Sequence, residues 1–328
     1  MELSWPVLFN TFGLIILTAV ALGLFGIEIL PRVRIALVMV VGVVILGFPG
    51  WALIKPAMAQ GAATFVEGDI SILDAALCIV LAYIAGLCAY FAGWPHGRYL
   101  APLTVPTGIA YWALRSGNMT SLLKINFAVA DRKDVYSTLS IEGFFWLIVI
   151  TVGVLGAITA GKLTSPKPIE QPEPASAKKQ KNNKILNFAT AILATVIIAQ
   201  FSIGILAQDV RLFDSELGTV TGQPSTPQIA FAVITAFILA GFLVKWLLDA
   251  GPIPVTIAAA VLAFIVMRFY TNPEVIEYMA KNYPVAFFAR PISAILPIQL
   301  LSFAAIGSLA GCWIGIKFVE SRKAAQKK

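Results

Sequence analysis

The residues that could do catalytic or metal chemistry are few in this sequence and lie far apart. His96, in GWPHGRY, is the sole histidine, and its loop offers no clear nucleophile or orienting carboxylate for catalysis. The cysteines Cys78, Cys88 and Cys312 lie in apolar runs without CxxC or His-rich spacing. We interpret His96 as a residue of a structural turn and the cysteines as packing residues, and we expect no metal site and no cofactor.

Motifs of the common enzyme classes are also missing from the sequence. It contains no HExxH, no GxSxG, no phosphate-binding loop and no paired Asp motif. These observations favour a protein that is not an enzyme. A lipid-modifying enzyme around His96 and Arg98 is the remaining enzymatic alternative.

Composition points to a protein of the lipid bilayer. Of the 328 residues, 59% are hydrophobic and 12% are charged, whereas about 25% of the residues of a soluble domain are charged. Uncharged runs long enough to cross a bilayer as helices recur along the chain. We predict an all-α, polytopic membrane helical bundle with about nine transmembrane helices, at approximately 9–30, 34–54, 72–94, 100–115, 139–161, 185–207, 228–248, 252–269 and 295–317.

The distribution of Lys and Arg predicts how these spans are oriented. Basic residues collect in the loops and tail that lie on the inner side when the N-terminus is outside. We therefore predict a multi-pass protein of the plasma (inner) membrane, with its N-terminus outside and its C-terminus in the cytoplasm. The flexible Lys/Pro-rich cytosolic linker 164–184 and the basic cytosolic tail 318–328 would be attracted to anionic lipids at the inner face. No aromatic residues interleave with the linker charges, so we expect no nucleic-acid partner.

An internal repeat is the strongest pattern along the chain. A displacement of about 154 residues places the spans of 34–163 on those of 185–317, with loops of matching length. Gly86 then falls close to Gly241. Four spans per repeat is an even number, so the two four-helix membrane repeats would be parallel, with 1–33 as an extra N-terminal transmembrane helix.

Each repeat carries a polar to amphipathic segment before its last span, at 116–139 and at 271–294. In the second segment, Tyr278 and Tyr283 beside Lys281 suit an interfacial helix with its rings at headgroup depth. Such segments either cap a central cavity on the outer face or simply anchor the protein at the interface.

Prolines interrupt the third span of each repeat, in LAPLTVPTG (100–108) and AGPIPVTIA (250–258). A proline removes a backbone donor and frees a carbonyl one turn earlier, which lipid cannot satisfy but a wet cavity can. The candidate cavity-lining residues are Pro102, Thr104, Pro106, Thr107, Gly108, Pro254 and Thr256. Alternatively the prolines mark helix starts, an explanation that suits Pro254 better than Pro106.

Glycines recur every fourth residue in the last span, at Gly307, Gly311 and Gly315. This spacing puts them on one helix face and predicts close helix packing. The neighbouring helix would belong either to the other repeat or to another protomer, in a homo-oligomer or a membrane complex.

Two hypotheses of function follow from these features. The first is a permease or channel-like protein that passes a small, neutral or weakly anionic solute between the two repeats, with Arg115 and Arg268 forming a basic outer mouth. The alternative is a non-catalytic scaffold or anchoring subunit of a membrane protein complex. The scarcity of buried polar residues and the glycine face of the last span favour the alternative.

Overall fold

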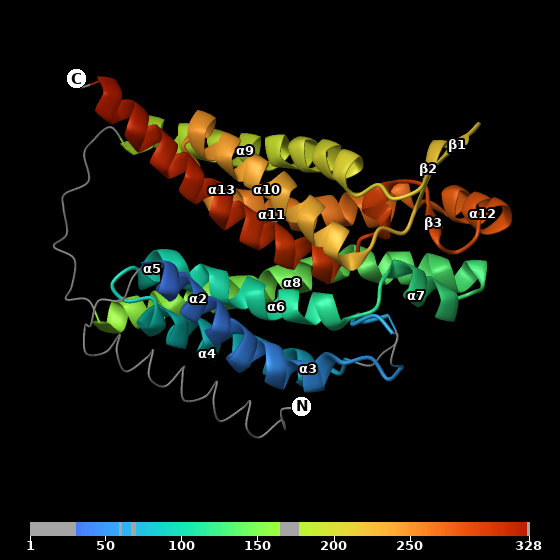
Figure 1. Cartoon of the computed structure of the whole chain (residues 1–328), viewed down its shortest axis with the longest axis horizontal. Coiled ribbons are helices and arrows are strands. Elements are labelled where there is room, and N and C mark those ends of the chain that lie inside the picture. The colour runs from blue at the N-terminus through green and yellow to red at the C-terminus, as the bar shows by residue number, and fades with distance from the viewer. Residues whose placement is uncertain (1–30, 59–60, 67–69, 165–176, 327–328) are drawn as a thin grey trace. The chain divides into compact units, whose positions relative to one another are not determined.

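The computed structural model describes residues 31–58, 61–66, 70–164 and 177–326, and most of them are helical (Figure 1). The helices, in chain order, are α2 (Pro31–Val41), the π-helix η1 (Gly42–Gly47), α3 (Phe48–Ile54), α4 (Ile72–Ala92), α5 (Gly97–Leu100), the short 3-10 helix η2 (Ala101–Leu103), α6 (Thr104–Arg115), α7 (Met119–Ile125), α8 (Val129–Thr164), α9 (Ala177–Leu206), α10 (Thr226–Leu248), α11 (Pro252–Ile265), the π-helix η3 (Val266–Tyr270), α12 (Pro273–Asn282), the 3-10 helix η4 (Pro291–Ala294) and α13 (Pro297–Gln326).

Seven helical stretches in the described residues are long and apolar enough to cross a membrane. They are Arg32–Ile54, Ile72–Ala92, Val129–Thr164, Lys184–Leu206, Thr226–Leu248, Pro252–Tyr270 and Pro297–Gln326. Each contains or closely matches one predicted span, and together they fit a multi-pass membrane protein. The predicted span 9–30 lies outside the described residues. The predicted span 100–115 is occupied by the end of α5, by η2 and by α6, which is 12 residues long.

The predicted linker and tail are partly helical in the structure. Helix α9 begins at Ala177, inside the predicted linker 164–184, and residues 165–176 lie outside the described part of the chain. Helix α13 continues to Gln326 and so includes most of the predicted tail. Both helices therefore extend beyond the stretch that their apolar residues require.

The chain divides into two compact units. The first holds α2 to α6 and the part of α8 that begins at Ile148. The second holds the described residues of Pro56–Val66, those of Ser116–Leu147, and everything described from α9 onward. Helix α8 thus contributes its first half to the second unit and its second half to the first.

Helix α6 packs on η1 by backbone contact within the first unit. A Cβ atom on Gly42 would lie 2.0 Å from the carbonyl oxygen of Thr104, so only glycine allows this approach. The indole of Trp112, which is fully buried, donates a 2.7 Å hydrogen bond from Nε1 to the carbonyl of Gly47. This bond joins α6 to the last residue of η1.

Helices α10 and α13 form the closest helix pair of the second unit, with α9 and α11 packed on them. A Cβ on Gly307 would lie 2.6 Å from the carbonyl oxygen of Ile234, and one on Gly311 would lie 2.3 Å from that of Ile238. Gly315 faces the stem of Lys245. The three glycines of α13 therefore contact α10, a helix of the same predicted repeat.

A small antiparallel sheet stands at one end of the second unit, which we call the sheet end (Figure 1). It consists of β1 (Arg211–Asp214), β2 (Gly218–Gly222) and β3 (Phe287–Phe288), with β2 in the middle. The all-α prediction does not include it. The β-branched residues of GTVTG, Thr219, Val220 and Thr221, are its signal in the sequence, together with Gly218, whose φ of +75° suits the turn between the strands.

Candidate anion-binding pocket

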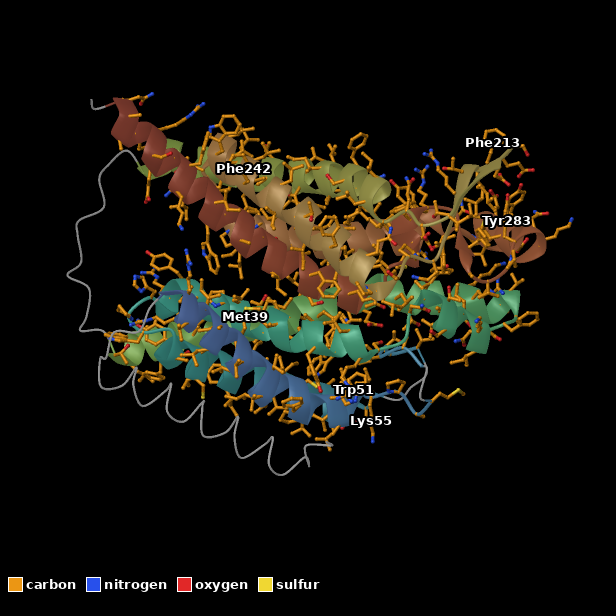
Figure 2. All side chains as sticks on the ribbon, in the orientation of Figure 1. Met39, Trp51, Lys55, Phe213, Phe242 and Tyr283 are labelled. Atoms are coloured by element: carbon orange, nitrogen blue, oxygen red, sulfur yellow. The ribbon has the colours of Figure 1, made fainter. Side chains whose placement is uncertain are left out.

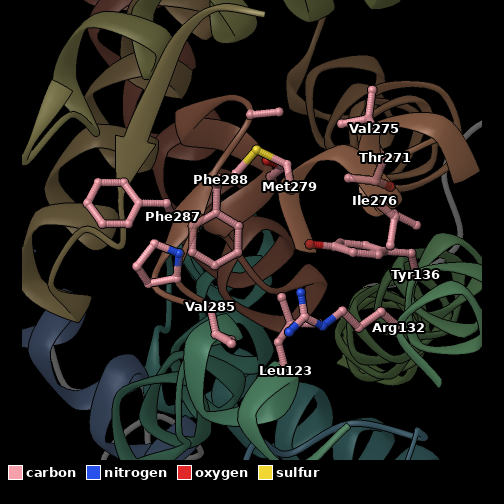
Figure 3. Close-up of a pocket in the computed structure, with 13 residues that line it drawn as sticks. Leu123, Arg132, Tyr136, Thr271, Val275, Ile276, Met279, Val285, Phe287 and Phe288 are labelled. Atoms are coloured by element: carbon pink, nitrogen blue, oxygen red, sulfur yellow. The ribbon is translucent and has the colours of Figure 1, made fainter. Parts of the chain in front are cut away.

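A small pocket lies at the sheet end of the second unit, between α7, the start of α8, α12 and the segment that contains β3 (Figure 3). Its walls are largely apolar, with Leu123 on one side and Ile276, Met279, Val285 and Phe288 around it. Its volume of about 30 Å³ is enough for roughly two water molecules or one small polar group.

Arg132 brings a positive charge into this apolar pocket. Arg132 is only 7% exposed, and its guanidinium points into the pocket (Figure 3). Its Nε has no hydrogen-bond partner among the described residues. The contact that the guanidinium does make is with the ring of Phe127, whose centroid lies 6.0 Å from Cζ.

The neighbouring charges do not neutralise Arg132. Lys133, the next residue of α8, forms a 2.6 Å ion pair with Glu277 of α12, which ties the two helices together beside the pocket. The other ion pair in the described residues joins Lys245 to Asp249. Arg132 takes part in neither, so within the described chain its charge is buried without a carboxylate.

Tyr136 lies one helical turn after Arg132 and faces the same pocket, with its hydroxyl directed toward Phe288 and Met279 (Figure 3). It is also 7% exposed. The hydroxyls of Thr271 and Ser293, which line the pocket too, donate to the backbone carbonyls of Met267 and Arg290. The guanidinium and the phenol are therefore the donors left to bind a guest.

A nearly buried guanidinium without a counter-charge carries a desolvation cost. An anion in the pocket would remove that cost. The fork of N–H groups on Arg132 matches the two oxygens of a carboxylate, and the Tyr136 hydroxyl can add a third hydrogen bond. This arrangement can bind one small anion and hold it away from water.

Asp214 of β1 is a buried carboxylate of the sheet end that does not line the pocket, and both of its oxygens accept hydrogen bonds from other residues. Its Oδ1 accepts hydrogen bonds from the backbone N–H groups of Glu216 (2.9 Å) and Leu217 (2.6 Å). Its Oδ2 accepts from the hydroxyls of Tyr278 (2.8 Å) and Tyr283 (2.6 Å). These bonds, that of Leu217 first and that of Tyr283 second, lower the pKa of Asp214 to about 2. Asp214 therefore ties the β1–β2 turn to α12 and the residue after it.

The structure gives Tyr278 and Tyr283 a role that sequence reasoning missed. The sequence suggests rings at headgroup depth, whereas both hydroxyls bind Asp214. The hydrogen bond of Tyr278 to Asp214 raises the pKa of Tyr278 to about 12, since a phenolate beside a carboxylate is disfavoured. Phe213, next to Asp214 on β1, is 85% exposed and projects from the hairpin (Figure 2).

The predicted cavity residues of the first unit lie in and just before α6. Pro102 is half-buried, and Thr104, Pro106, Thr107 and Gly108 are buried. Pro106 is the third residue of α6, which follows directly on η2, so its missing N–H falls within a continuous helical stretch. The hydroxyl of Thr107 donates to the carbonyl of Leu103, whereas Thr104, 0% exposed, has no partner for its hydroxyl among the described residues.

None of the other predicted residues lines the pocket. Pro254 and Thr256 stand near the start of α11, where the Thr256 hydroxyl donates to the Pro252 carbonyl at 3.1 Å. Arg115 is exposed at the end of α6 and stacks on the rings of Trp51 and Tyr111, with centroids 5.2 and 5.3 Å from its Cζ. Arg268 is exposed in η3.

Sequence reasoning did not single out Arg132 or Tyr136. Both lie in the amphipathic segment 116–139, where their i, i+4 spacing puts them on one helix face. That spacing is the available signal, but it does not reveal that α12 and β3 cover this face. The burial that gives Arg132 its chemistry comes from residues more than a hundred positions away in the sequence.

Comparisons of this chain with protein-family models, with curated proteins and with solved structures found no match.

Proposed function

We propose that this membrane protein is a permease or channel-like protein for a small anionic solute, and that the pocket around Arg132 binds the negative group of that solute. The observation that carries the proposal is the nearly buried guanidinium, directed into an apolar pocket and without a carboxylate partner in the described residues. Seven apolar helices supply the membrane setting in which such a solute would be passed.

The pocket favours a monocarboxylate among small anions. Two parallel N–H donors on a guanidinium match a carboxylate better than a spherical ion. The small volume excludes a second charged group from the pocket itself. This is the weakly anionic class of solute that the sequence suggests.

Thr104 is our candidate for a solute-facing group in the first unit. Its buried hydroxyl lacks a partner among the described residues, as expected of a group that bonds to a passing solute or water. Pro102, Pro106, Thr107 and Gly108 surround it in the chain. We retain Pro254, Thr256, Arg115 and Arg268 as proposed contributors, the two arginines because both are exposed at helix ends.

The proposed duplication is supported by matched glycine contacts. In the first unit Gly86 of α4 meets the backbone of Gly153 in α8, and in the second Gly241 of α10 meets the backbone of Ser308 in α13. Each pair joins the second and fourth helices of a predicted repeat. We propose parallel repeats on this basis, and an outside N-terminus on the distribution of basic residues.

The scaffold alternative loses one of the two features that favoured it. That hypothesis drew on the glycine face of the last span as a surface for a neighbouring protein. In the structure Gly307, Gly311 and Gly315 face α10 of the same chain. We therefore keep the permease as the proposal.

Flux through reconstituted protein tests the proposal. Liposomes that contain the purified chain should take up short monocarboxylates, and Arg132→Gln should lower the initial rate at least about tenfold, because it removes a charge-assisted hydrogen-bond donor. Lys124→Gln, which removes an exposed charge from neighbouring α7, is the matched control and should leave the rate unchanged. Absence of flux for every small anion tried, or equal rates in the wild type and Arg132→Gln, would overturn the proposal.

A further inference from the structure

A second, larger cavity lies along α9 in the second unit, with a volume of about 470 Å³. Such a volume is typical of sites that hold small molecules. One wall is the face of α9 that carries Ile197, Phe201 and Ile205, and the other includes Thr219 of β2 and Arg290. We call this cavity the α9 groove.

The apolar wall of the α9 groove lies within the part of α9 that can cross the membrane, Lys184–Leu206. Ile197, Phe201 and Ile205 are 60%, 71% and 59% exposed, so the described chain leaves this wall largely uncovered. Gly204 lines the groove and leaves it open, because a Cβ at this position would point into space with no atom within 4 Å. An apolar wall at this position will contact lipid chains.

Arg290 gives the α9 groove a fixed positive charge. Its Cζ lies 4.9 Å from the centroid of the Tyr270 ring, and the Tyr270 hydroxyl accepts a hydrogen bond from the Gln200 side chain. Stacking occupies the face of the guanidinium and leaves its N–H edge available. Within the described residues this exposed side chain forms no ion pair.

We infer that the α9 groove binds one anionic phospholipid, with an acyl chain along Ile197, Phe201 and Ile205 and the phosphate on Arg290. The apolar wall and the cation at its edge match the two halves of such a lipid, and the charge favours an anionic headgroup over a zwitterionic one. The site is distinct from the pocket of Arg132 and goes beyond the proposed function.

Native mass spectrometry of the full chain tests this site. The protein is taken up in nanodiscs of phosphatidylcholine with a minor share of phosphatidylglycerol, and the lipid that stays bound after release is identified. Wild type should retain one phosphatidylglycerol. Arg290→Gln should lower its retention relative to phosphatidylcholine about tenfold. Gly204→Leu should abolish retention of both lipids, since the new side chain fills the groove without meeting the backbone.

Arg211→Gln is the matched control, because Arg211 is an exposed arginine of the same unit that does not line the groove. It should retain phosphatidylglycerol as the wild type does. Equal retention by the wild type and the folded Arg290→Gln or Gly204→Leu variant would overturn the inference. Displacement of the bound lipid by glycerol phosphate alone would also overturn it, because the acyl chain would then contribute nothing. Neither result bears on monocarboxylate flux.

Discussion

Gly86 of α4 and Gly153 of α8 pack backbone against backbone: a Cβ on Gly86 would lie 1.9 Å from the carbonyl oxygen of Gly153. In the second unit a Cβ on Gly241 of α10 would lie 2.9 Å from the carbonyl oxygen of Ser308 in α13. Without a hydrophobic driving force between helices in lipid, close packing of this kind is a main source of helix association.

Gly86→Ala should therefore destabilise the first unit. The added methyl group would force the two backbones apart, at a cost of about 1–3 kcal/mol in the free energy of unfolding. Gly204→Ala is the matched control, because its Cβ meets open space and a helical Gly→Ala change then gains roughly 0.5–1 kcal/mol. Thermal unfolding in detergent measures both variants. Equal effects of the two substitutions would contradict the observed packing.

The hairpin should lose its attachment to α12 in acid. The bonded carboxylate of Asp214 has its pKa lowered from 3.8 to about 2, so its contribution to stability is present above about pH 4 and is lost as the pH falls toward 2. The amides of Glu216 and Leu217 donate to Asp214, and their protection against hydrogen exchange, relative to the intrinsic rate at each pH, should fall over this interval.

Asp214→Asn should remove that acid transition, because an asparagine side chain does not titrate. Asp209→Asn, a change at an exposed position, is the control and should retain the transition. If the amides of Glu216 and Leu217 show the same pH dependence in Asp214→Asn as in the wild type, another group controls the hairpin.

Much of the helical architecture could be predicted from the sequence, because lipid forces each span to be a long apolar run and to satisfy its own backbone. The sequence-predicted spans 34–54 and 228–248 begin or end within a few residues of the observed helices. The sheet of β1 to β3 could not be foreseen as easily, since β3 is two residues long and comes from beyond α12. Arg132 was missed for the same reason, because distant residues bury it.

Thr104→Val tests the proposed role of the Thr104 hydroxyl. The substitution keeps the shape of the side chain and removes a buried hydroxyl that has no partner among the described residues. We expect the melting temperature to stay the same or rise, and monocarboxylate flux in liposomes to fall, because a solute-facing hydrogen bond is gone. Thr195→Val is the control, because the buried Thr195 hydroxyl donates to the Ala191 carbonyl of its own helix, and it should leave the flux unchanged. An unchanged flux in Thr104→Val would exclude Thr104 from the solute path.

Tyr136→Phe should weaken anion binding less than loss of Arg132 does. It removes one neutral donor and keeps the ring, so we expect a loss of roughly threefold to tenfold in affinity, the equivalent of about 0.5–1.5 kcal/mol. Titration of the purified protein with a short monocarboxylate measures the change. A loss as large as that of Arg132→Gln would contradict this order, because the phenol would then contribute as much as the guanidinium.

The most direct test of the anion pocket is calorimetric titration of the purified full chain with a short monocarboxylate. We predict that one anion binds per chain and that Arg132→Gln weakens its affinity at least about tenfold, whereas Lys124→Gln leaves it unchanged. Equal affinities for the wild type and a folded Arg132→Gln variant, or no binding to the wild type, would contradict the assignment of this pocket.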